Sequence, residues 1–245
     1  MLEKNKFFDI NKLPTEEGLL LFPISMSRIT TSQNPAHCLK YIKNFTPKFS
    51  APKVGLNFIY GDFLYLYSPK KSSDLKEKFM FQMVNHKNGI QKLLLKERQE
   101  FQIQQAFSYM GWNQLYLSSV NFPDLLKKLR EIYKNDKNFK KYIKEDTKTL
   151  KKHLDKNQIN FFLEEHLAFY LMSKGQIKLP NDYIQGREKW ILWCYPGKAP
   201  KALIYLYQLN PFNLHNSKNK YEDVVMYNLE DKKIYNVSNI DLKFY

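Results

Sequence analysis

A short apolar run that ends in hydroxyl groups restricts the fold of this chain more than any other feature. Leu19 to Phe22 lead through Pro23 and Ile24 to Ser25, after which the sequence turns to hydroxyls, an arginine and turn-forming residues. An apolar run without polar alternation is typical of a strand buried on both faces, as in a parallel sheet. Ligands of such sheets bind just beyond the carboxyl ends of the strands. Ser25 is therefore a candidate reacting hydroxyl, although a serine at such a place more often serves in a turn or caps a helix.

The segments that follow predict an α/β fold. A helix is expected over 35–45, and the β-branched and aromatic residues of 54–67 predict a second strand that runs into a loop near Gly61 and Asp62. Residues 72–108 are typical of one long or two shorter helices, and 115–120 of a short third strand, with a helix from Asp124 onwards. Strand, helix and strand in this order begin an α/β sheet. Neither of the first two strands is followed by a glycine-rich phosphate loop, so we expect a Rossmann-like sheet without the nucleotide-binding fingerprint.

A later helix, predicted over 158–172, carries two acidic residues within a mostly apolar sequence. Glu164 and Glu165 would point about 100° apart on a helix, so only one of them is expected to face the interior. A carboxyl on the apolar side of a buried helix is costly unless it has a partner or a function. The alternative is that both carboxylates lie on the solvated face.

The last part of the chain predicts further strands. Residues 189–197 form a second apolar run that ends near Tyr195, and this end would lie beside the end of the first strand in one parallel sheet. A tyrosine there is more often a packing residue with its hydroxyl at the rim. Residues 202–209 and 223–227 are strand-like and would complete the sheet. Because no repeat, linker or change of composition interrupts the chain, we expect one domain over residues 1–245.

Positive charge is the most informative property of the composition. The 245 residues carry a net charge of +15, with 43% hydrophobic and 16% aromatic residues, as in a globular protein. Such an excess favours binding to polyanions, either nucleic acid or an anionic membrane surface. The alternative is a drift in composition without a partner. Between Lys127 and Lys156, twelve Lys or Arg stand against five Asp or Glu, a net charge of +7.

Basic residues recur in this segment at steps of three or four, so on a continuous helix they would form one stripe about 30 Å long. Such a stripe could follow the phosphates of a nucleic acid without reading its bases. A helix break at 135–138 would rotate it. The stripe consists of Arg130, Lys134, Lys137, Lys141, Lys144, Lys148 and Lys151. A second basic set, which a solvated helix face would explain equally well, consists of Lys87, Lys92, Lys96 and Arg98.

Other features argue against membrane and metal sites. No apolar run reaches the roughly 20 residues of a membrane span. Residues 1–17, expected to be a loosely ordered lead-in, lack the apolar core of a signal peptide. Cys38 and Cys194 are far apart and the histidines are scattered, so no metal-ligand spacing occurs. We therefore expect a reduced, cytoplasmic protein without a metal.

Three segments together resemble the tRNA-dependent cyclodipeptide synthases. They are PISMSR around Ser25, NFFLEEHLAF around Glu165 and WCYPG around Tyr195, in the order and spacing of that family along most of the chain. Proline after the tyrosine is similar to the branch that has proline there instead of histidine. That branch also lacks the asparagine that is otherwise common three residues after the serine, and this chain has Arg28 at that place.

The resemblance implies a single Rossmann-like α/β domain with a mainly parallel sheet flanked by helices, similar to the catalytic domain of class I aminoacyl-tRNA synthetases. It also implies ping-pong acyl transfer from two aminoacyl-tRNAs, through an aminoacyl- and a dipeptidyl-ester of Ser25, to a cyclic dipeptide. Glu165 would hold the substrate ammonium and take its proton, and Tyr195 would relay a proton near Ser25. Because the tRNA ester is already activated, the resemblance implies no ATP, metal or other cofactor.

The substrate positions that match the family are apolar, so the resemblance implies a hydrophobic first amino acid. Because one methylene is worth only about 1–3 kcal/mol, it also implies a mixture of products. These positions are Leu21, Pro23, Ala168 and Trp193. The family tyrosine one turn before the glutamate is Phe161 here, which has no hydroxyl. Either Glu165 alone binds the amino group, or the register is shifted by one and Glu164 is the acid.

Two other interpretations stay open. The chain could be a non-catalytic tRNA- or RNA-binding module, which the missing hydroxyl at Phe161 would favour. It could also be an unrelated α/β acyl hydrolase that uses Ser25, but the GxSxG motif and a placed His and Asp pair are missing. The basic helices match the region where cyclodipeptide synthases hold tRNA, so aminoacyl-tRNA is the expected partner of a monomeric enzyme.

Overall fold

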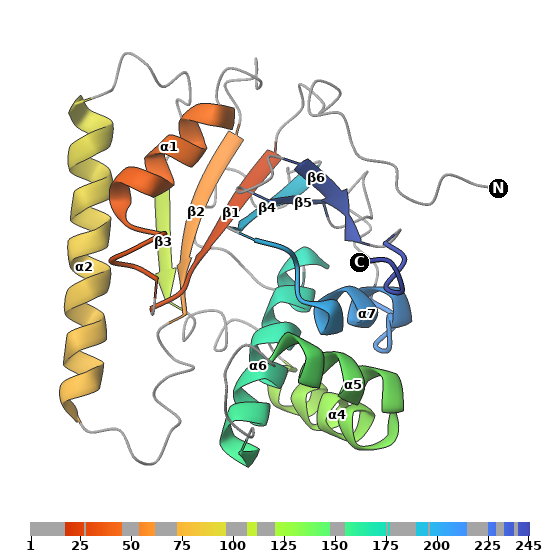
Figure 1. Cartoon of the computed structure of the whole chain (residues 1–245). Coiled ribbons are helices and arrows are strands. Elements are labelled where there is room, and N and C mark those ends of the chain that lie inside the picture. Colours follow the sequence, from red (N-terminus) through yellow and green to blue (C-terminus); the bar gives the residue numbers. More distant parts are fainter. Residues whose placement is uncertain are drawn as a thin grey trace.

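The chain forms a six-stranded sheet with helices grouped at its two sides (Figure 1). The computed structural model describes residues 18–26, 28–45, 54–61, 73–96, 107–111, 121–147, 155–174, 176, 190–195, 197–214, 225–228, 233–237 and 240–245. The side chains of the strand at 190–195 and of some other residues in these ranges lie outside the description. None of the described helices combines the length and the apolarity that crossing a membrane requires.

The sheet has the order β3-β2-β1-β4-β5-β6 and is parallel except at one edge. The parallel strands are β1 (Gly18–Ile24), β2 (Val54–Tyr60), β3 (Phe107–Gly111), β4 (Trp190–Tyr195) and β5 (Val225–Asn228). β6 (Lys233–Asn236) pairs with β5 in the antiparallel direction. The order reverses at β1, which lies between β2 and β4, and ligands of open α/β sheets bind at such a switch point.

Consecutive residues of β1 and β2 are buried, so both faces of the sheet centre are covered. Leu21 and Phe22 on β1 are 0% and 2% exposed, and Phe58 and Ile59 on β2 are 0% and 1% exposed. Neighbouring residues of a strand point to opposite faces, so burial of both members of a pair requires a cover on each face. This confirms the first strand predicted from the apolar run that precedes Ser25.

Helices α1 (Pro35–Phe45) and α2 (Ser73–Lys96) pack against each other on the β3 side of the sheet (Figure 1). Of the one long or two shorter helices predicted over 72–108, α2 is present and ends at Lys96, residues 97–106 lie outside the described residues, and the prediction is wrong for 107–108, which belong to β3. This five-residue segment contains a serine and a glycine, so pairing with β2 rather than local propensity makes it a strand. The predicted strand at 115–120 lies outside the described residues.

Helices α4 (Phe122–Asn135) and α5 (Lys137–Asp146) replace the single continuous helix on which the basic stripe would depend. Asp136 separates them. Its backbone N–H donates to the carbonyl of Ile132, and its carboxylate accepts from the N–H groups of Asn138 and Phe139 at 2.8 and 3.0 Å. The same residue therefore ends one helix and caps the next. One continuous stripe is wrong, and the break falls where the sequence allowed it.

Helices α6 (Lys156–Ser173) and α7 (Lys201–Leu209) complete the second group. The prediction of a strand over 202–209 was wrong. Asp146, at the end of α5, accepts hydrogen bonds from the N–H groups of Lys201 and Ala202, both at 2.8 Å, which satisfies free donors at the start of α7. Asn210 ends the helix with a φ of 41°. A cap supplied by a distant residue leaves no local signal in the sequence.

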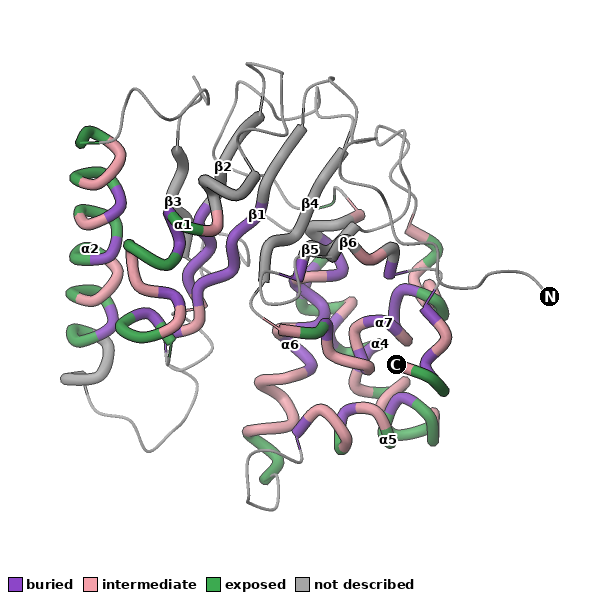
Figure 2. Tube along the Cα trace, turned by 45° about the horizontal axis from the view of Figure 1, so that its top comes forward, coloured by how far each residue is buried: buried purple, intermediate pink, exposed green. Residues whose placement is uncertain are grey.

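Helices α4 to α7 share a large apolar cluster with the sheet. Figure 2 shows in purple the buried residues of these helices. Leu126 and Leu129 of α4, Ile143 of α5 and Leu167 of α6 are at most 2% exposed and belong to it together with Leu21 of β1. Burying each such side chain contributes on the order of 1.5–3 kcal/mol. This cluster holds α6 beside the sheet and so positions its acidic residues.

Candidate active site at the carboxyl edge of the sheet

Ser25 directly follows β1 at the carboxyl edge of the sheet, the lower edge in Figure 1. In the parallel register Leu21 lies opposite Trp193 and Ile24 lies opposite Tyr60, so the last residue of β4, Tyr195, emerges at the same edge. The predicted adjacency of the two strand ends is therefore confirmed for the backbone. The side chains of Trp193 and Tyr195 lie outside the described residues.

The segment after Ser25 folds back under it. The N–H of Arg28 donates to the carbonyl of Ser25 at 2.9 Å, and the N–H groups of Thr31 and Gln33 donate to the carbonyl of Arg28 at 2.9 and 3.0 Å. The Gln33 side chain then returns to the strand end. Its Oε1 accepts from the Ser25 N–H at 2.8 Å, and its Nε2 donates to the Pro23 carbonyl at 2.6 Å. Gln33 thus binds the peptide groups on both sides of Ile24, as a neighbouring strand would.

Glu165 on α6 lies close enough to Arg28 for their charges to interact. Burial of its carboxyl is the largest effect and raises the pKa of Glu165 to about 7, while the positive charge of Arg28 acts in the opposite direction. Arg28 is exposed and Glu165 is half-buried as a residue. The structure therefore brings an acid that titrates near neutrality to the loop that begins with Ser25.

Glu164 has a different partner. Its Oε1 is 3.6 Å from Nη2 of Arg130 on α4, and its side chain is 11% exposed. The Nε of Arg130 also donates to Asn160 Oδ1 at 3.2 Å. Burial raises the pKa of Glu164 and the charge of Arg130 opposes this effect. Of the two predicted acids, Glu164 thus joins α6 to α4, and Glu165 faces the Ser25 loop.

His166 follows the two acids on α6 and is 2% exposed. Its Nδ1–H donates to the Phe162 carbonyl at 2.6 Å, and its Nε2 is buried without a hydrogen-bond partner. Burial lowers the pKa of His166 to about 4, so the ring is neutral at physiological pH. It therefore adds no positive charge beside Glu165.

Two of the described apolar substrate candidates belong to one extended buried cluster. Leu21 and Ala168 are 0% and 1% exposed and belong to the same buried cluster, and Pro23 is buried at the strand end. Phe161, one turn before Glu165, is half-buried and packs against this cluster, with its ring edge-to-face to Phe162 at 5.3 Å. The surroundings of Glu165 on α6 are therefore largely apolar.

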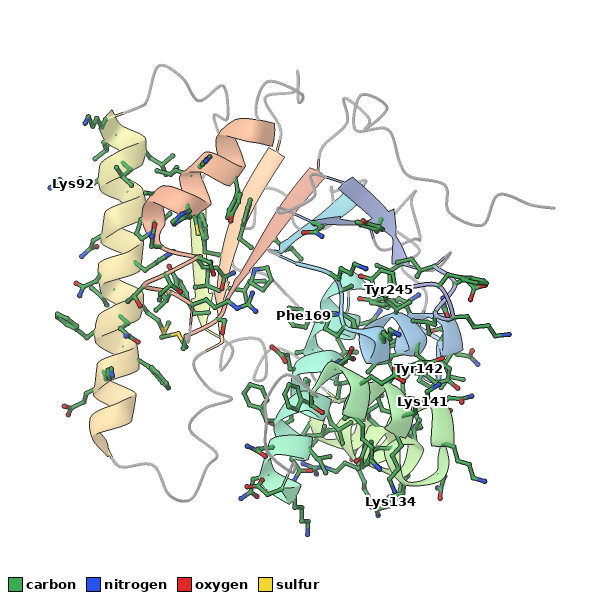
Figure 3. The ribbon with its side chains drawn as sticks, viewed as in Figure 1. Lys92, Lys134, Lys141, Tyr142, Phe169 and Tyr245 are labelled. Atoms are coloured by element: carbon green, nitrogen blue, oxygen red, sulfur yellow. The ribbon has the colours of Figure 1, made fainter. Side chains whose placement is uncertain are left out.

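The predicted basic residues fall into two groups on opposite sides of the molecule (Figure 3). Lys87, Lys92 and Lys96 lie exposed on α2. Exposed residues of α4 and α5 form the other group: Lys134, Lys137, Lys141 and Lys144. Lys134 pairs with Glu131 at 2.7 Å and Lys141 with Glu145 at 3.8 Å. Arg130 is turned towards α6, as described above, and Arg98, Lys148 and Lys151 lie outside the described residues.

A metal site would need several ligating side chains in one place. Within the described ranges, no group of three or more His, Cys, Asp or Glu side chains is arranged to hold a metal ion. The absence of a metal or cofactor remains a prediction.

No protein-family model and no curated protein matches the sequence. Solved structures do resemble its fold. A CDPS from Fluoribacter dumoffii is 15% identical, with 82% of this chain and 85% of that chain covered and a TM-score of 0.52. A cyclodipeptide synthase from Bacillus thermoamylovorans is 14% identical, with 86% and 87% covered and a TM-score of 0.52.

A third similar structure is a Mycobacterium tuberculosis protein described as demonstrating that cyclodipeptide synthetases are related to type I tRNA-synthetases. It is 13% identical, with 77% of this chain and 78% of that chain covered and a TM-score of 0.50. At these identities the likeness concerns the fold, and it confirms the predicted Rossmann-like α/β architecture.

Proposed function

We propose that this chain is an acyltransferase that makes cyclic dipeptides from two aminoacyl-tRNAs, the activity named for the solved structures that share its fold. The observation that carries this proposal is that Ser25 lies at the carboxyl edge of the sheet and that Arg28, on the same loop, is close enough to Glu165 of α6 for their charges to interact. A serine at a strand end, an acid that titrates near neutrality and an apolar wall suit transfer of an amino acid from an activated ester.

The proposed reaction proceeds in three steps on Ser25. Its hydroxyl attacks the ester carbonyl of the first aminoacyl-tRNA, forming a serine ester, and the terminal hydroxyl of that tRNA leaves with the proton. The free amine of the bound amino acid then attacks the ester of a second aminoacyl-tRNA, which forms a peptide bond and releases the second tRNA. Finally, the terminal amine of the dipeptide attacks the serine ester, which closes the ring and restores Ser25.

Charged groups have separate tasks in this scheme. Glu165 as a carboxylate binds the ammonium of the first amino acid and takes its proton before the amine attacks. Tyr195 relays the proton between Ser25 and the leaving tRNA hydroxyl. Arg28 keeps part of the Glu165 population ionised and is exposed to the incoming substrate. The tRNA ester supplies the energy of peptide bond formation, so no ATP or metal is required.

The proposed specificity is for a hydrophobic first amino acid, held at Leu21, Pro23, Phe161, Ala168 and Trp193. The proposed tRNA contacts are the exposed lysines of α4 and α5, because α4 packs on α6, which carries Glu165, and α5 packs on α4. The chain would act as a monomer in the cytoplasm, where aminoacyl-tRNAs are made.

The decisive experiment incubates the protein with a pool of aminoacyl-tRNAs and detects cyclic dipeptides and acylated intact protein by mass spectrometry. Wild-type protein should give both, and Ser25→Ala should give neither. Ser32→Ala, on the same loop, is the matched control and should keep both. Retarded tRNA without acylation would instead support a non-catalytic tRNA-binding module, the alternative that the missing hydroxyl of Phe161 favours. Salt-insensitive turnover of small esters would support an acyl hydrolase.

A further inference from the structure

Three polar residues are buried together beneath the Ser25 loop, each from a different element. Tyr60 ends β2, His86 lies in the middle of α2, and Gln33 precedes α1; they are 1%, 3% and 3% exposed. Buried polar groups cost free energy unless each finds a hydrogen-bond partner. Their number at one place, next to a candidate nucleophile, calls for a physical reason.

Hydrogen bonds join these residues in a chain. His86 Nε2 lies 2.8 Å from the backbone oxygen of Gln33, and His86 Nδ1 lies 2.9 Å from the Tyr60 hydroxyl. A carbonyl oxygen can only accept, so Nε2 carries the proton and Nδ1 accepts from Tyr60. The thiol of Cys38 also donates to the Gln33 carbonyl at 3.3 Å. Gln33 is thus held by its backbone from below.

The Gln33 side chain connects this anchored backbone to the end of β1. It accepts from the Ser25 N–H and donates to the Pro23 carbonyl, so both of its polar atoms are used. These two hydrogen bonds hold the peptide groups before and after Ile24. They therefore restrict the direction of the Ser25 Cα–Cβ bond, along which the side chain leaves the strand. The residue after β2 also holds this peptide, because the Gly61 N–H donates to the Ile24 carbonyl at 2.9 Å.

Close packing of α2 against the start of α1 keeps the chain of hydrogen bonds short. Gly89 lies one turn after His86, and a Cβ added to it would meet Pro35 Cγ at 2.7 Å. A larger residue there would push α1 away from α2. The ring of His86 is also held edge-on against Tyr60, with ring centroids 5.6 Å apart.

We propose that Gln33 and His86 are positioning residues for Ser25: His86 anchors the Gln33 backbone, and the Gln33 amide sets the geometry of the peptide that carries the nucleophile. The proposal rests on the function proposed for Ser25. A displacement of the nucleophile by about 1 Å can lower the rate about 100-fold. The network therefore affects the rate of acylation more than the affinity for tRNA.

The first test measures hydrogen exchange at the Ser25 amide, which does not depend on catalysis. In the wild-type protein the Ser25 N–H should exchange at least about 100-fold more slowly than in an unfolded chain, and Gln33→Met should remove this protection. Gln91→Met, an exposed glutamine of α2, is the matched control. Fast exchange in the wild-type protein, or equal protection in Gln33→Met, would overturn the proposal.

The second test measures single-turnover acylation of Ser25 by aminoacyl-tRNA. Gln33→Met should acylate about 10- to 100-fold more slowly at an unchanged affinity for tRNA. Gln33→Glu keeps the shape, and its protonated carboxyl can still accept from Ser25 and donate to Pro23. Once ionised it cannot donate, so its rate relative to wild type should fall as the pH rises from about 5.5 to 8.5, since burial raises the pKa of a carboxyl.

Neighbouring groups do not produce this pH dependence. Burial lowers the pKa of His86 and raises that of Cys38 to about 12, and both groups are present in the wild-type protein and in the variant alike. Glu165 titrates in the wild-type protein and in Gln33→Glu, so its effect cancels in the ratio of the two acylation rates. A ratio that does not change with pH would overturn the proposal, even if Gln33→Met failed to fold.

The role of His86 is tested by rescue. His86→Leu should slow acylation, and His86→Gln, whose amide can donate to the Gln33 carbonyl, should restore most of the rate. His37→Leu, an exposed histidine of α1, serves as the control. Equal rates in His86→Leu and His86→Gln would overturn the role of His86. Absence of acylation in the wild-type protein would refute the proposed function, and amide exchange would still decide on the positioning of Ser25.

Discussion

Both the α1–α2 pair and the α4–α7 group bury apolar side chains, but the α1–α2 pair adds a chain of buried hydrogen bonds under the Ser25 loop. Among α4–α7, apolar side chains such as Leu129 and Ile143 form one extended buried cluster with the sheet. Under the Ser25 loop, the α1–α2 pair instead buries Gln33 and His86 in a chain of hydrogen bonds. Apolar burial has no direction, whereas a hydrogen bond weakens steeply when its angle changes. The apolar cluster therefore suits a role in stability, and the hydrogen-bonded residues suit the proposed positioning of Ser25.

The candidate site lies where these two regions meet. Ser25 and Arg28 belong to the loop that the α1–α2 pair supports, and Glu165 belongs to α6 of the other group. Substitutions in the two regions should therefore affect the candidate site in different ways. Those in the polar region should slow acylation as well as lower stability, and those in the apolar region should act mainly on stability.

The largest effect is expected from Glu165→Gln, at the junction. Cyclic dipeptide formation should fall at least about 100-fold, because an amide cannot take the proton of the substrate ammonium. The thermal stability of the variant, in contrast, should rise. The folded-state pKa of about 7 lies above the ordinary value, so wild-type protein loses stability as the pH rises from the unfolded pKa through 7. The variant lacks this loss and should melt at a higher temperature at pH 8.

Glu164→Gln is the matched control for this prediction, because it changes the neighbouring acid that pairs with Arg130. It should keep most of the product and lose some stability. An active Glu165→Gln together with an inactive Glu164→Gln would assign the acid to Glu164 instead.

Leu129→Ala tests the apolar region. Leu129 is 0% exposed, so the substitution should leave a cavity and lower the free energy of unfolding by about 2–5 kcal/mol, measured by denaturant titration. Leu95→Ala, at a residue of α2 that is 71% exposed, should change it by about 0.5 kcal/mol or less. Similar losses in both variants would contradict the assignment of the core to the α4–α7 group.

Gly89→Ala tests the polar region through packing alone. The new Cβ would press on Pro35, so acylation of Ser25 should slow and stability should fall by about 1–3 kcal/mol. An unstrained change from Gly to Ala inside a helix would instead stabilise by about 1 kcal/mol. Asn88→Ala, the preceding exposed residue, provides the control. A stabilised and fully active Gly89→Ala would show that α1 and α2 are not closely packed there.

Arg28→Met should produce a smaller effect, visible in the pH profile. Without the positive charge the pKa of Glu165 rises further, so the rise of activity with pH should move upwards by about one unit or less. Product formation measured from pH 5.5 to 8.5 checks this shift. Arg28→Lys keeps the charge and should keep the wild-type profile, and an unchanged profile in Arg28→Met would separate Arg28 from Glu165.

The smallest effects are expected from single lysines. Lys137→Gln and Lys144→Gln, both on α5, should each weaken tRNA binding a few-fold and reduce the slope of log affinity against log salt by about one. Lys92→Gln, on α2 at the opposite side of the molecule, should leave both unchanged (Figure 3). Binding titrations at several salt concentrations measure this difference. Equal effects on α2 and α5 would mean that tRNA contacts both groups.

Several features of the site were predictable from local sequence. The apolar run before Ser25 needs both faces covered, which requires a central strand, and its end must then lie at the ligand-binding edge. The run that ends at Tyr195 follows the same logic, and its backbone emerges beside β1 as predicted. The possible break of the basic helix was also visible, because Asp136 is a preferred helix cap.

Other features depended on contacts between distant segments. The residues of α7 mix helix formers with the isoleucine and tyrosines typical of strands, and the first N–H groups of the helix are capped by Asp146, more than fifty residues earlier. Helical spacing does not tell which of Glu164 and Glu165 faces the Ser25 loop. Only the positions of Arg130 and Arg28 distinguish the two acids. No pattern in the local sequence indicated that the Gln33 side chain binds the Ser25 N–H.

By itself, the sequence determined the central strand, the serine at its end and the acidic helix, because burial and periodicity depend on neighbouring residues. The tertiary structure alone decided that 201–209 is a helix, which acid lies near Arg28, and which polar group binds the Ser25 N–H. The physical reason is that a hydrogen bond or an ion pair needs two partners at a fixed distance. When those partners are far apart in the chain, only the folded backbone brings them together.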